Sequence, residues 1–205
     1  MSKKADNVEH YFTERPKSEA RFGLIRTYLR GKPFDFMTAS GVFSKDRVDL
    51  GTRILVESMV LPENGCLLDV GCGYGAVGIA AAVFNPNLHV AMVDVNIRAV
   101  RLARRNAKLN HVWNTEIRHG HLYEAVEDVV FDCVVSNPPV SAGMKTVEAI
   151  IAQAPEHMAS RATLQAVVKS KICGKRLLSF FEDAFGNVDV LARGSGYRVL
   201  ISQKQ

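Results

Sequence analysis

The chain has 205 residues, of which 47% are hydrophobic and 23% are charged, and its net charge is +5. This length fits one α/β domain with a short extension, and the composition excludes a wholly disordered protein. No run of residues approaches the roughly 20 apolar side chains of a membrane span, and the polar start at Met1–Asp6 is not a secretory signal. We therefore expect a cytoplasmic protein with no membrane segment.

Cysteine and histidine spacing excludes a metal site from the expected functions. The four cysteines are not paired at the short intervals of a zinc site, and the histidines are scattered. We expect free thiols, buried where they lie in apolar runs, and no bound metal.

Positive charge is concentrated at the two ends of the chain. Lys and Arg outnumber Asp and Glu by ten to seven in residues 1–50 and by seven to three in residues 169–205. In residues 51–168 there are nine basic against eleven acidic side chains. A polyanion such as RNA would therefore contact the ends. The alternative is that these side chains only make the surface soluble.

The first fifty residues predict an extension rather than part of the main domain. Residues 1–20 are polar and without periodicity, so we expect a loosely ordered arm. The turn Gly31-Lys32-Pro33 separates two short β-rich runs, and a helical spacing of apolar residues follows them. The expected elements are strands at Phe22–Arg30 and Phe34–Thr38 and a helix at Asp49–Val60. We divide the chain into an arm with a β-hairpin, residues 1–50, and a main domain, residues 51–205.

From residue 65 onward, short apolar runs alternate with amphipathic segments. Strands are predicted at Cys66–Val70, Leu88–Val95, Glu116–His119, Val129–Ser136, Leu164–Val168, Val188–Ala192 and Tyr197–Ser202. Helices are predicted at Ala76–Phe84, Asn96–Asn110, Thr146–Met158 and Lys175–Phe185. Trp113 is expected to pack under a helix end.

The order of these elements predicts the fold class. Strands that alternate with helices imply right-handed crossovers and a parallel sheet. The turn Gly194-Ser195-Gly196 is too short for a crossover, so the last two strands must be antiparallel. We predict an α/β fold with a doubly wound, Rossmann-like, mostly parallel seven-stranded sheet. An antiparallel C-terminal hairpin forms its edge, and a short β/α extension precedes it.

The segment Asp69-Val70-Gly71-Cys72-Gly73-Tyr74-Gly75 joins the first strand of this sheet to a helix. Ligands bind such sheets beyond the carboxyl ends of the strands. Glycines there allow positive φ and let a ligand lie against bare backbone. Asp94 ends the next strand, where its carboxylate can accept hydrogen bonds from two ribose hydroxyls.

Two cofactors fit this layout. Gly73-Tyr74-Gly75-Ala76-Val77-Gly78 is a G-x-G-x-x-G run, which is compatible with a dinucleotide. S-adenosylmethionine has a cationic amino group and no pyrophosphate, so the acid Asp69 before the loop favours it. A carboxylate beside a pyrophosphate would repel it. The third interpretation is that the glycines serve tight turns only.

Ser136-Asn137-Pro138-Pro139 closes the fourth apolar strand. Two prolines donate no backbone hydrogen bond and are expected to hold the chain extended, with carbonyls directed outward. The Asn137 amide oxygen and the Pro138 carbonyl could then both accept from one planar amine, which is catalysis by positioning and electrostatics. We assign Asn137, Pro138 and Pro139 as catalytic. The alternative is an Asx-turn with prolines that end a strand.

These motifs resemble those of class I S-adenosylmethionine-dependent methyltransferases, in particular the small-domain family that includes the catalytic half of the bacterial 16S ribosomal RNA guanine-N2 methyltransferase. The resemblance covers roughly residues 35–205 and includes Gly41-Val42-Phe43-Ser44 and Asp49-Leu50-Gly51-Thr52. It implies that Phe43 and its neighbours close over the cofactor. The expected cofactor-binding residues are Phe43, Asp69, Gly71, Cys72, Gly73, Gly75, Asp94, Val95, Asn96, His121, Leu122 and Asn137.

The sequence departs from this family at two positions. His121 stands where related proteins usually have an Asp near the adenine amine, and a ring nitrogen could accept in its place. Val140 replaces an aromatic residue that could stack on a base.

The resemblance implies an enzyme that transfers a methyl group from S-adenosylmethionine to an exocyclic amine of RNA. The preferred target is guanine N2 in ribosomal or transfer RNA. The alternatives are adenine N6, a protein glutamine amide, a non-catalytic cofactor-binding RNA module and a nicotinamide oxidoreductase. Val140 argues against the first two alternatives, because those enzymes usually carry an aromatic residue after the prolines.

Overall fold

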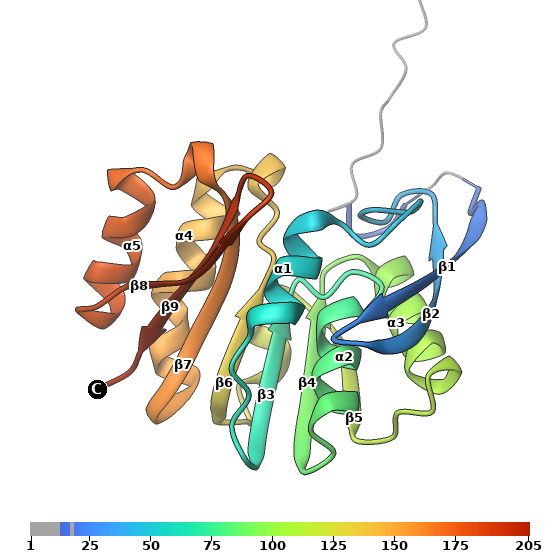
Figure 1. Ribbon diagram of the computed structural model, residues 1–205, viewed down its shortest axis with the longest axis horizontal. Coiled ribbons are helices and arrows are strands. Elements are labelled where there is room, and N and C mark those ends of the chain that lie inside the picture. Colours follow the sequence, from blue (N-terminus) through green and yellow to red (C-terminus); the bar gives the residue numbers. More distant parts are fainter. Residues whose placement is uncertain (1–12, 17–18) are drawn as a thin grey trace, which may run out of the picture.

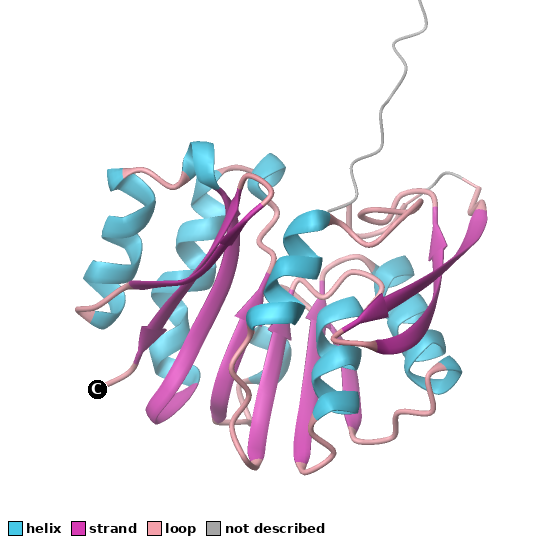
Figure 2. Ribbon diagram, viewed as in Figure 1, coloured by secondary structure: helices cyan, strands magenta, loops and turns pink. Residues whose placement is uncertain are grey.

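The computed structural model of the protein describes residues 13–16 and 19–205, so most of the predicted arm at residues 1–20 lies outside it. Within the described residues, nine strands form a two-stranded hairpin and a seven-stranded sheet, with helices on both faces of the sheet (Figures 1 and 2). The hairpin consists of β1 (Phe22–Leu29) and β2 (Lys32–Ala39). No helix within residues 13–16 and 19–205 is long and apolar enough to cross a bilayer.

The large sheet has the strand order β5-β4-β3-β6-β7-β9-β8. Its strands are β3 (Gly65–Val70), β4 (Leu88–Asp94), β5 (Thr115–His119), β6 (Phe131–Ser136), β7 (Met158–Lys169), β8 (Asp189–Gly194) and β9 (Tyr197–Gln203). Strands β3 to β7 run parallel, and β9 is antiparallel to both β7 and β8. The predicted fold class is therefore confirmed, with β9 inserted between β7 and the edge strand β8.

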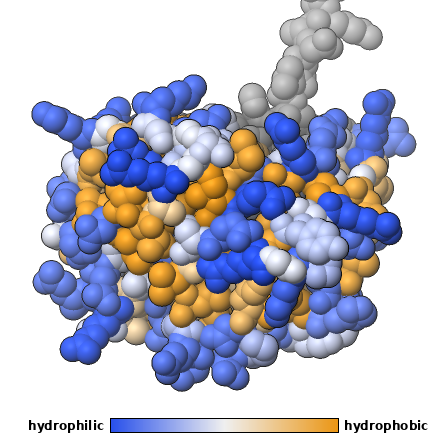
Figure 3. All heavy atoms as spheres, in the orientation of Figure 1, coloured by the Kyte–Doolittle hydropathy of each residue, from blue (hydrophilic) through white to orange (hydrophobic). Residues whose placement is uncertain are grey.

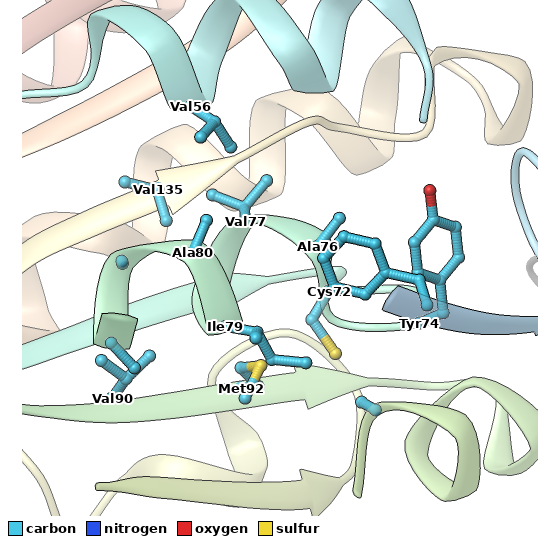
Figure 4. Close-up of a cluster of buried hydrophobic side chains, with 14 of the residues drawn as sticks. Val56, Cys72, Tyr74, Ala76, Val77, Ile79, Ala80, Val90, Met92 and Val135 are labelled. Atoms are coloured by element: carbon cyan, nitrogen blue, oxygen red, sulfur yellow. The ribbon is translucent and has the colours of Figure 1, made fainter. Parts of the chain in front are cut away.

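The helices cover opposite faces of this sheet. One face carries α1 (Leu50–Ser58), α2 (Ala76–Phe84) and α3 (Ile97–Leu109), and the other carries α4 (Met144–Gln153) and α5 (Lys175–Phe185). Successive strand residues alternate between the two cores, since Leu67 joins the first cluster and Leu68 the second. Figure 4 shows α2 in the first core, with Val77 directed toward Val56 of α1 and Ile79 toward Met92 of β4.

Residues 13–16 and 19–205 also contain four short 3₁₀ segments. They are η1 (Glu124–Val126), η2 (Val140–Ala142), η3 (Ala154–His157) and η4 (Ser170–Ile172). The helix predicted over Thr146–Met158 ends earlier, because Pro155 lies in the first turn of η3 and cannot continue an α-helix. Strand β7 then begins at Met158, six residues before the predicted strand at Leu164. Strand β7 pairs with β6 at Met158 and again from Thr163, and the polar residues Ser160 and Arg161 lie in the irregular stretch between these two positions. Their polarity is why the sequence predicts no strand there.

One buried position was wrongly predicted. Trp113 is 75% exposed, whereas Val112 beside it is buried at 5% exposure. The turn before β5 contains His111 with φ 56°, and Val112, not the indole of Trp113, packs inward.

The hairpin packs its inner face on α2 and α3. Phe34 stacks on Phe36 with ring centroids 5.7 Å apart, and Phe36 lies 5.6 Å from the ring of Tyr74. Its outer face keeps the large side chains of Phe22, Leu24 and Tyr28 exposed. Figure 3 shows hydrophobic and hydrophilic residues intermixed over the face of the molecule that is turned to the viewer in Figure 1.

Two asparagines at the C-terminal end of α3, Asn106 within the helix and Asn110 as its C-cap, bind the free edge of β2. Asn106 Oδ1 accepts from the Met37 N–H at 2.7 Å, and its Nδ2 donates to the carbonyls of Met37 at 2.9 Å and Tyr74 at 2.8 Å. Asn110 makes the same pair of bonds with the backbone of Asp35. The side chains thus satisfy a strand edge and join the hairpin to the glycine-rich loop.

Candidate functional site

A cavity of about 320 Å³ lies at the carboxyl ends of β3, β4 and β6, toward the top of Figure 1. Ten of the twelve predicted cofactor residues line it, and the predicted catalytic residues Asn137, Pro138 and Pro139 line it too. The other two, Gly75 and Asn96, lie behind its wall. Gly75 is the N-cap of α2, where a Cβ would come within 2.9 Å of Ile79. Asn96 caps α3 and donates to the carbonyl of Gly41.

The loop after β3 presents bare backbone to this cavity. Gly71 has φ 72° and Gly73 has φ 58°, and a Cβ added at either would meet no atom within 4 Å. Such angles favour glycine. The Gly71 and Cys72 N–H groups donate to the carbonyl of Val93 at 2.9 and 3.0 Å, which ties the loop to the end of β4. A flat ligand can therefore approach the main chain closely here.

Asp94 is fixed at the end of β4 by two backbone donors. Its Oδ2 accepts from the Gly73 N–H and its Oδ1 from the Asn96 N–H, each at 2.8 Å. The pKa of Asp94 is raised, because burial raises it by more than these two hydrogen bonds lower it. Each carboxylate oxygen keeps a further acceptor site, so Asp94 can accept hydrogen bonds from vicinal hydroxyls of a ligand.

Asp69 lies at the floor of the cavity, at 1% exposure. Its Oδ2 accepts from the Gly78 N–H at 2.9 Å. Burial raises the pKa of Asp69 to about 7 because it outweighs the hydrogen bond from Gly78, which lowers the pKa; the nearby charge of Asp94 adds a smaller increase. A cationic group in the cavity would favour the ionised carboxylate. The cavity therefore suits a ligand that carries both a positive charge and a ribose.

Asn137 follows β6, which Ser136 ties to β3 through a 2.9 Å bond from its Oγ to the carbonyl of Val70. The Asn137 Nδ2 donates to Thr52 Oγ1 at 2.9 Å and lies 3.4 Å from Asp49 Oδ2. Because both partners take up the NH₂ end, Oδ1 is the group left to accept from a ligand in the cavity.

The prolines do not hold the chain extended as predicted. The Pro138 carbonyl accepts from the Val140 N–H at 2.9 Å, and Pro139 has φ −76° and ψ 77°, an inverse γ-turn. The 3₁₀ segment η2 follows directly. One lone pair of the Pro138 carbonyl is thus used within the turn, and one remains for a ligand.

Other residues at the cavity were not assigned from the sequence. They include Val42, Thr52, Thr146 and Ile150. Only Val42 and Thr52 belong to the motifs that the chain shares with the methyltransferases it resembles. The apolar residues carried no signal beyond helical periodicity. His121 lines the cavity from an exposed position, with its Nδ1 3.4 Å from Glu124 Oε1. Among the described residues, no group of three His, Cys, Asp or Glu side chains could hold a metal ion.

The chain is similar to known proteins over most of its length. The family described as "Methyltransferase small domain" matches residues 33–201. The uncharacterized protein YbxB of Bacillus subtilis is 36% identical over 198 residues, which cover 96% of this chain and 98% of that protein. The ribosomal RNA small subunit methyltransferase C of Aeromonas hydrophila is 34% identical over 190 residues, which cover 89% of this chain and 53% of that protein.

Solved structures share the fold. The T. thermophilus 16S rRNA N2 G1207 methyltransferase, solved in complex with AdoMet and guanosine, matches with a TM-score of 0.80 at 23% identity. The match covers 93% of this chain and 52% of that one. The precorrin-6y C5,15-methyltransferase of Geobacter metallireducens matches with a TM-score of 0.65 at 20% identity. This chain thus spans about half the length of the ribosomal RNA methyltransferases that it matches.

Proposed function

The chain belongs to the methyltransferase small domain family and is an S-adenosylmethionine-dependent methyltransferase, and we propose that it methylates an exocyclic amine of RNA, with guanine N2 as the target. The cavity residues fit this cofactor: open glycine backbone, Asp94 for a ribose and Asp69 for a cationic amino group. When bound, the cofactor supplies an electrophilic methyl group on a sulfonium.

The observation that carries the proposal is the acceptor end of Asn137 in the same cavity as Asp94 and the glycine loop. The lone pair of an exocyclic amine is delocalised into its ring, so the nitrogen is a poor nucleophile. An acceptor that binds an amine proton holds the nitrogen in place and stabilises positive charge as it develops there. Asn137 Oδ1 supplies one such acceptor, and the free lone pair of the Pro138 carbonyl supplies a second.

RNA and guanine are inferred from the relatives together with the surface. The longer relatives that match over about half their length are named as ribosomal RNA methyltransferases, and one neighbour was solved with guanosine. On this chain, three exposed lysines lie at the carboxyl end of β7, at the same rim as the cavity: Lys169 ends the strand, Lys171 follows it and Lys175 begins α5. Exposed cations beside a cavity provide contacts for a phosphate backbone.

Nucleoside analysis tests this function directly. RNA from a strain that lacks the gene is incubated with the protein and S-adenosylmethionine, digested and analysed by mass spectrometry. We expect N2-methylguanosine to be formed. Asn137→Ala should reduce turnover by ~10²-fold or more, as the loss of one preorganised charge-stabilising group does, while cofactor affinity stays within about 3-fold.

A matched control is Asn187→Ala. Asn187 precedes β8, outside the cavity, and its side chain bonds Phe185 and Gln203. This variant should keep wild-type turnover if it is folded. Formation of N6-methyladenosine, or methylation of protein with none in RNA, would refute the guanine assignment. Wild-type turnover in Asn137→Ala would refute the role of Asn137.

A further inference from the structure

We propose that Asp49 and Thr52, at the start of α1, are positioning residues that hold the Asn137 amide with its oxygen toward the target amine. This inference rests on the proposed function and assigns to α1 a part in it. Asp49 and Thr52 lie 88 and 85 residues before Asn137 in the chain, and the fold brings them to the loop after β6.

The contacts are specific to the NH₂ end of Asn137. Thr52 is buried at 6% exposure and lines the cavity, and its Oγ1 accepts from Asn137 Nδ2 at 2.9 Å. Asp49 Oδ2 lies 3.4 Å from the same nitrogen. A carboxylate oxygen only accepts, so an inverted amide would place Asn137 Oδ1 against another acceptor. The carboxylate therefore selects one of the two amide orientations.

The same contact strengthens the acceptor at the other end of the amide. Hydrogen bonds in a chain polarise one another, and a bond in which one partner is ionised is stronger than a neutral one. Donation from Nδ2 toward the Asp49 carboxylate shifts electron density onto Oδ1. Asp49 thus contributes both orientation and negative charge, although it does not itself line the cavity.

Asp49 itself is held rigidly. It caps α1, since its Oδ2 accepts from the N–H groups of Gly51 at 2.8 Å and Thr52 at 3.3 Å. The hydroxyl of Tyr197, at the start of β9, also hydrogen-bonds to it, and burial and the Asp49 charge raise the pKa of Tyr197. A Cβ at Gly51 would come within 2.8 Å of the Tyr197 ring and 2.9 Å of Asp49 Oδ2. Only glycine leaves room for this arrangement.

Three variants separate positioning from folding. Thr52→Val removes the hydroxyl at constant shape, and Thr52→Ser restores it. Asp49→Asn removes the charge but keeps an N-cap side chain for α1. We expect kcat with the RNA described above to fall about 3- to 10-fold in Thr52→Val and roughly 10- to 100-fold in Asp49→Asn. The KM for RNA and the Kd for S-adenosylmethionine should stay within about 2-fold. Thr52→Ser should recover most of the loss.

A double-variant cycle isolates the route through Asn137. In the Asn137→Ala background, Thr52→Val should change kcat by less than about 2-fold, because the group that it positions is gone. Additive losses would overturn the proposal. The control Thr163→Val removes a hydroxyl in β7, where it bonds Cys133 Sγ and Gln165 outside the cavity, and should leave kcat unchanged.

A spectroscopic measurement needs no substrate. The Nδ2 proton resonances of Asn137, identified by their absence in Asn137→Ala, should lie downfield of those of a solvent-exposed amide because the NH₂ group donates to Thr52 Oγ1 and lies 3.4 Å from Asp49 Oδ2. They should move upfield in Thr52→Val and in Asp49→Asn and return in Thr52→Ser. Unchanged resonances in both variants would overturn the proposal. If the wild type methylates no RNA, the proposed function fails, and these resonances still decide whether Asp49 and Thr52 hold the amide.

Discussion

Replacing Asn106 by leucine should destabilise the protein and weaken cofactor binding together. Asn106 is fully buried in α3 and makes three hydrogen bonds, two to Met37 of β2 and one to the carbonyl of Tyr74 in the glycine loop. Leucine has a similar volume but neither donates nor accepts a hydrogen bond. The variant therefore leaves an N–H and two carbonyls without their partner while the core remains filled.

The magnitude follows from these groups. A buried polar group that loses its partner costs about 1–3 kcal/mol. Met37 is only half-buried, so water can reach its groups in part and the lower end applies to them. With about 1 kcal/mol for each of the two Met37 groups and about 1–3 kcal/mol for the Tyr74 carbonyl, the sum is about 3–5 kcal/mol. For a protein of this size, each kcal/mol lowers Tm by about 2–4 °C, so we expect a decrease of roughly 6–20 °C.

Asn110→Leu is the matched control, because Asn110 binds β2 at Asp35 in the same way but does not contact the glycine loop. Calorimetric scans give Tm, and titration gives the Kd for S-adenosylmethionine. Asn106→Leu should lower both Tm and affinity, whereas Asn110→Leu should lower Tm less and leave affinity unchanged. A Tm within about 2 °C of wild type for Asn106→Leu, or equal loss of affinity in both variants, would refute this reasoning.

Three further outcomes are expected. Asp94→Ala should weaken binding of the cofactor and of its demethylated product by ~1.5–3 kcal/mol, the range for hydrogen bonds to charged groups. Calorimetry measures the affinity, and an unchanged value would contradict this prediction. Burial raises the pKa of Asp69 to about 7, so the stability that its protonated form provides is complete below pH ~4 and is lost as the pH rises through ~7. The Tm of Asp69→Asn relative to wild type should therefore increase between about pH 5 and 8, and a constant difference would contradict this. Neutralising Lys169, Lys171 and Lys175 should flatten the slope of log RNA affinity against log salt by up to ~0.9 per duplex contact, or ~0.7 for single strands, whereas an unchanged slope would show that these lysines only face solvent.

The sequence by itself determined the fold class and the segments that line the cavity. Apolar periodicity depends on neighbours a few residues apart, so the alternation of strands and helices can be read locally. The glycine loop follows β3, Asp94 ends β4 and Asn137 follows β6, and the carboxyl ends of these parallel strands meet at one edge of the sheet. Their convergence on one cavity therefore followed from connectivity alone.

Only the tertiary structure decided how these groups are held. The inverse γ-turn at Pro139 uses one lone pair of the Pro138 carbonyl, which the sequence predicted to be free. Asn106 carries no functional signal in a helical pattern, yet it binds Met37 of β2, 69 residues before it, and Tyr74 of the glycine loop, 32 residues before it. Asn137 is oriented by a hydroxyl 85 residues away. Such hydrogen bonds depend on distance and direction in three dimensions, which local periodicity does not encode.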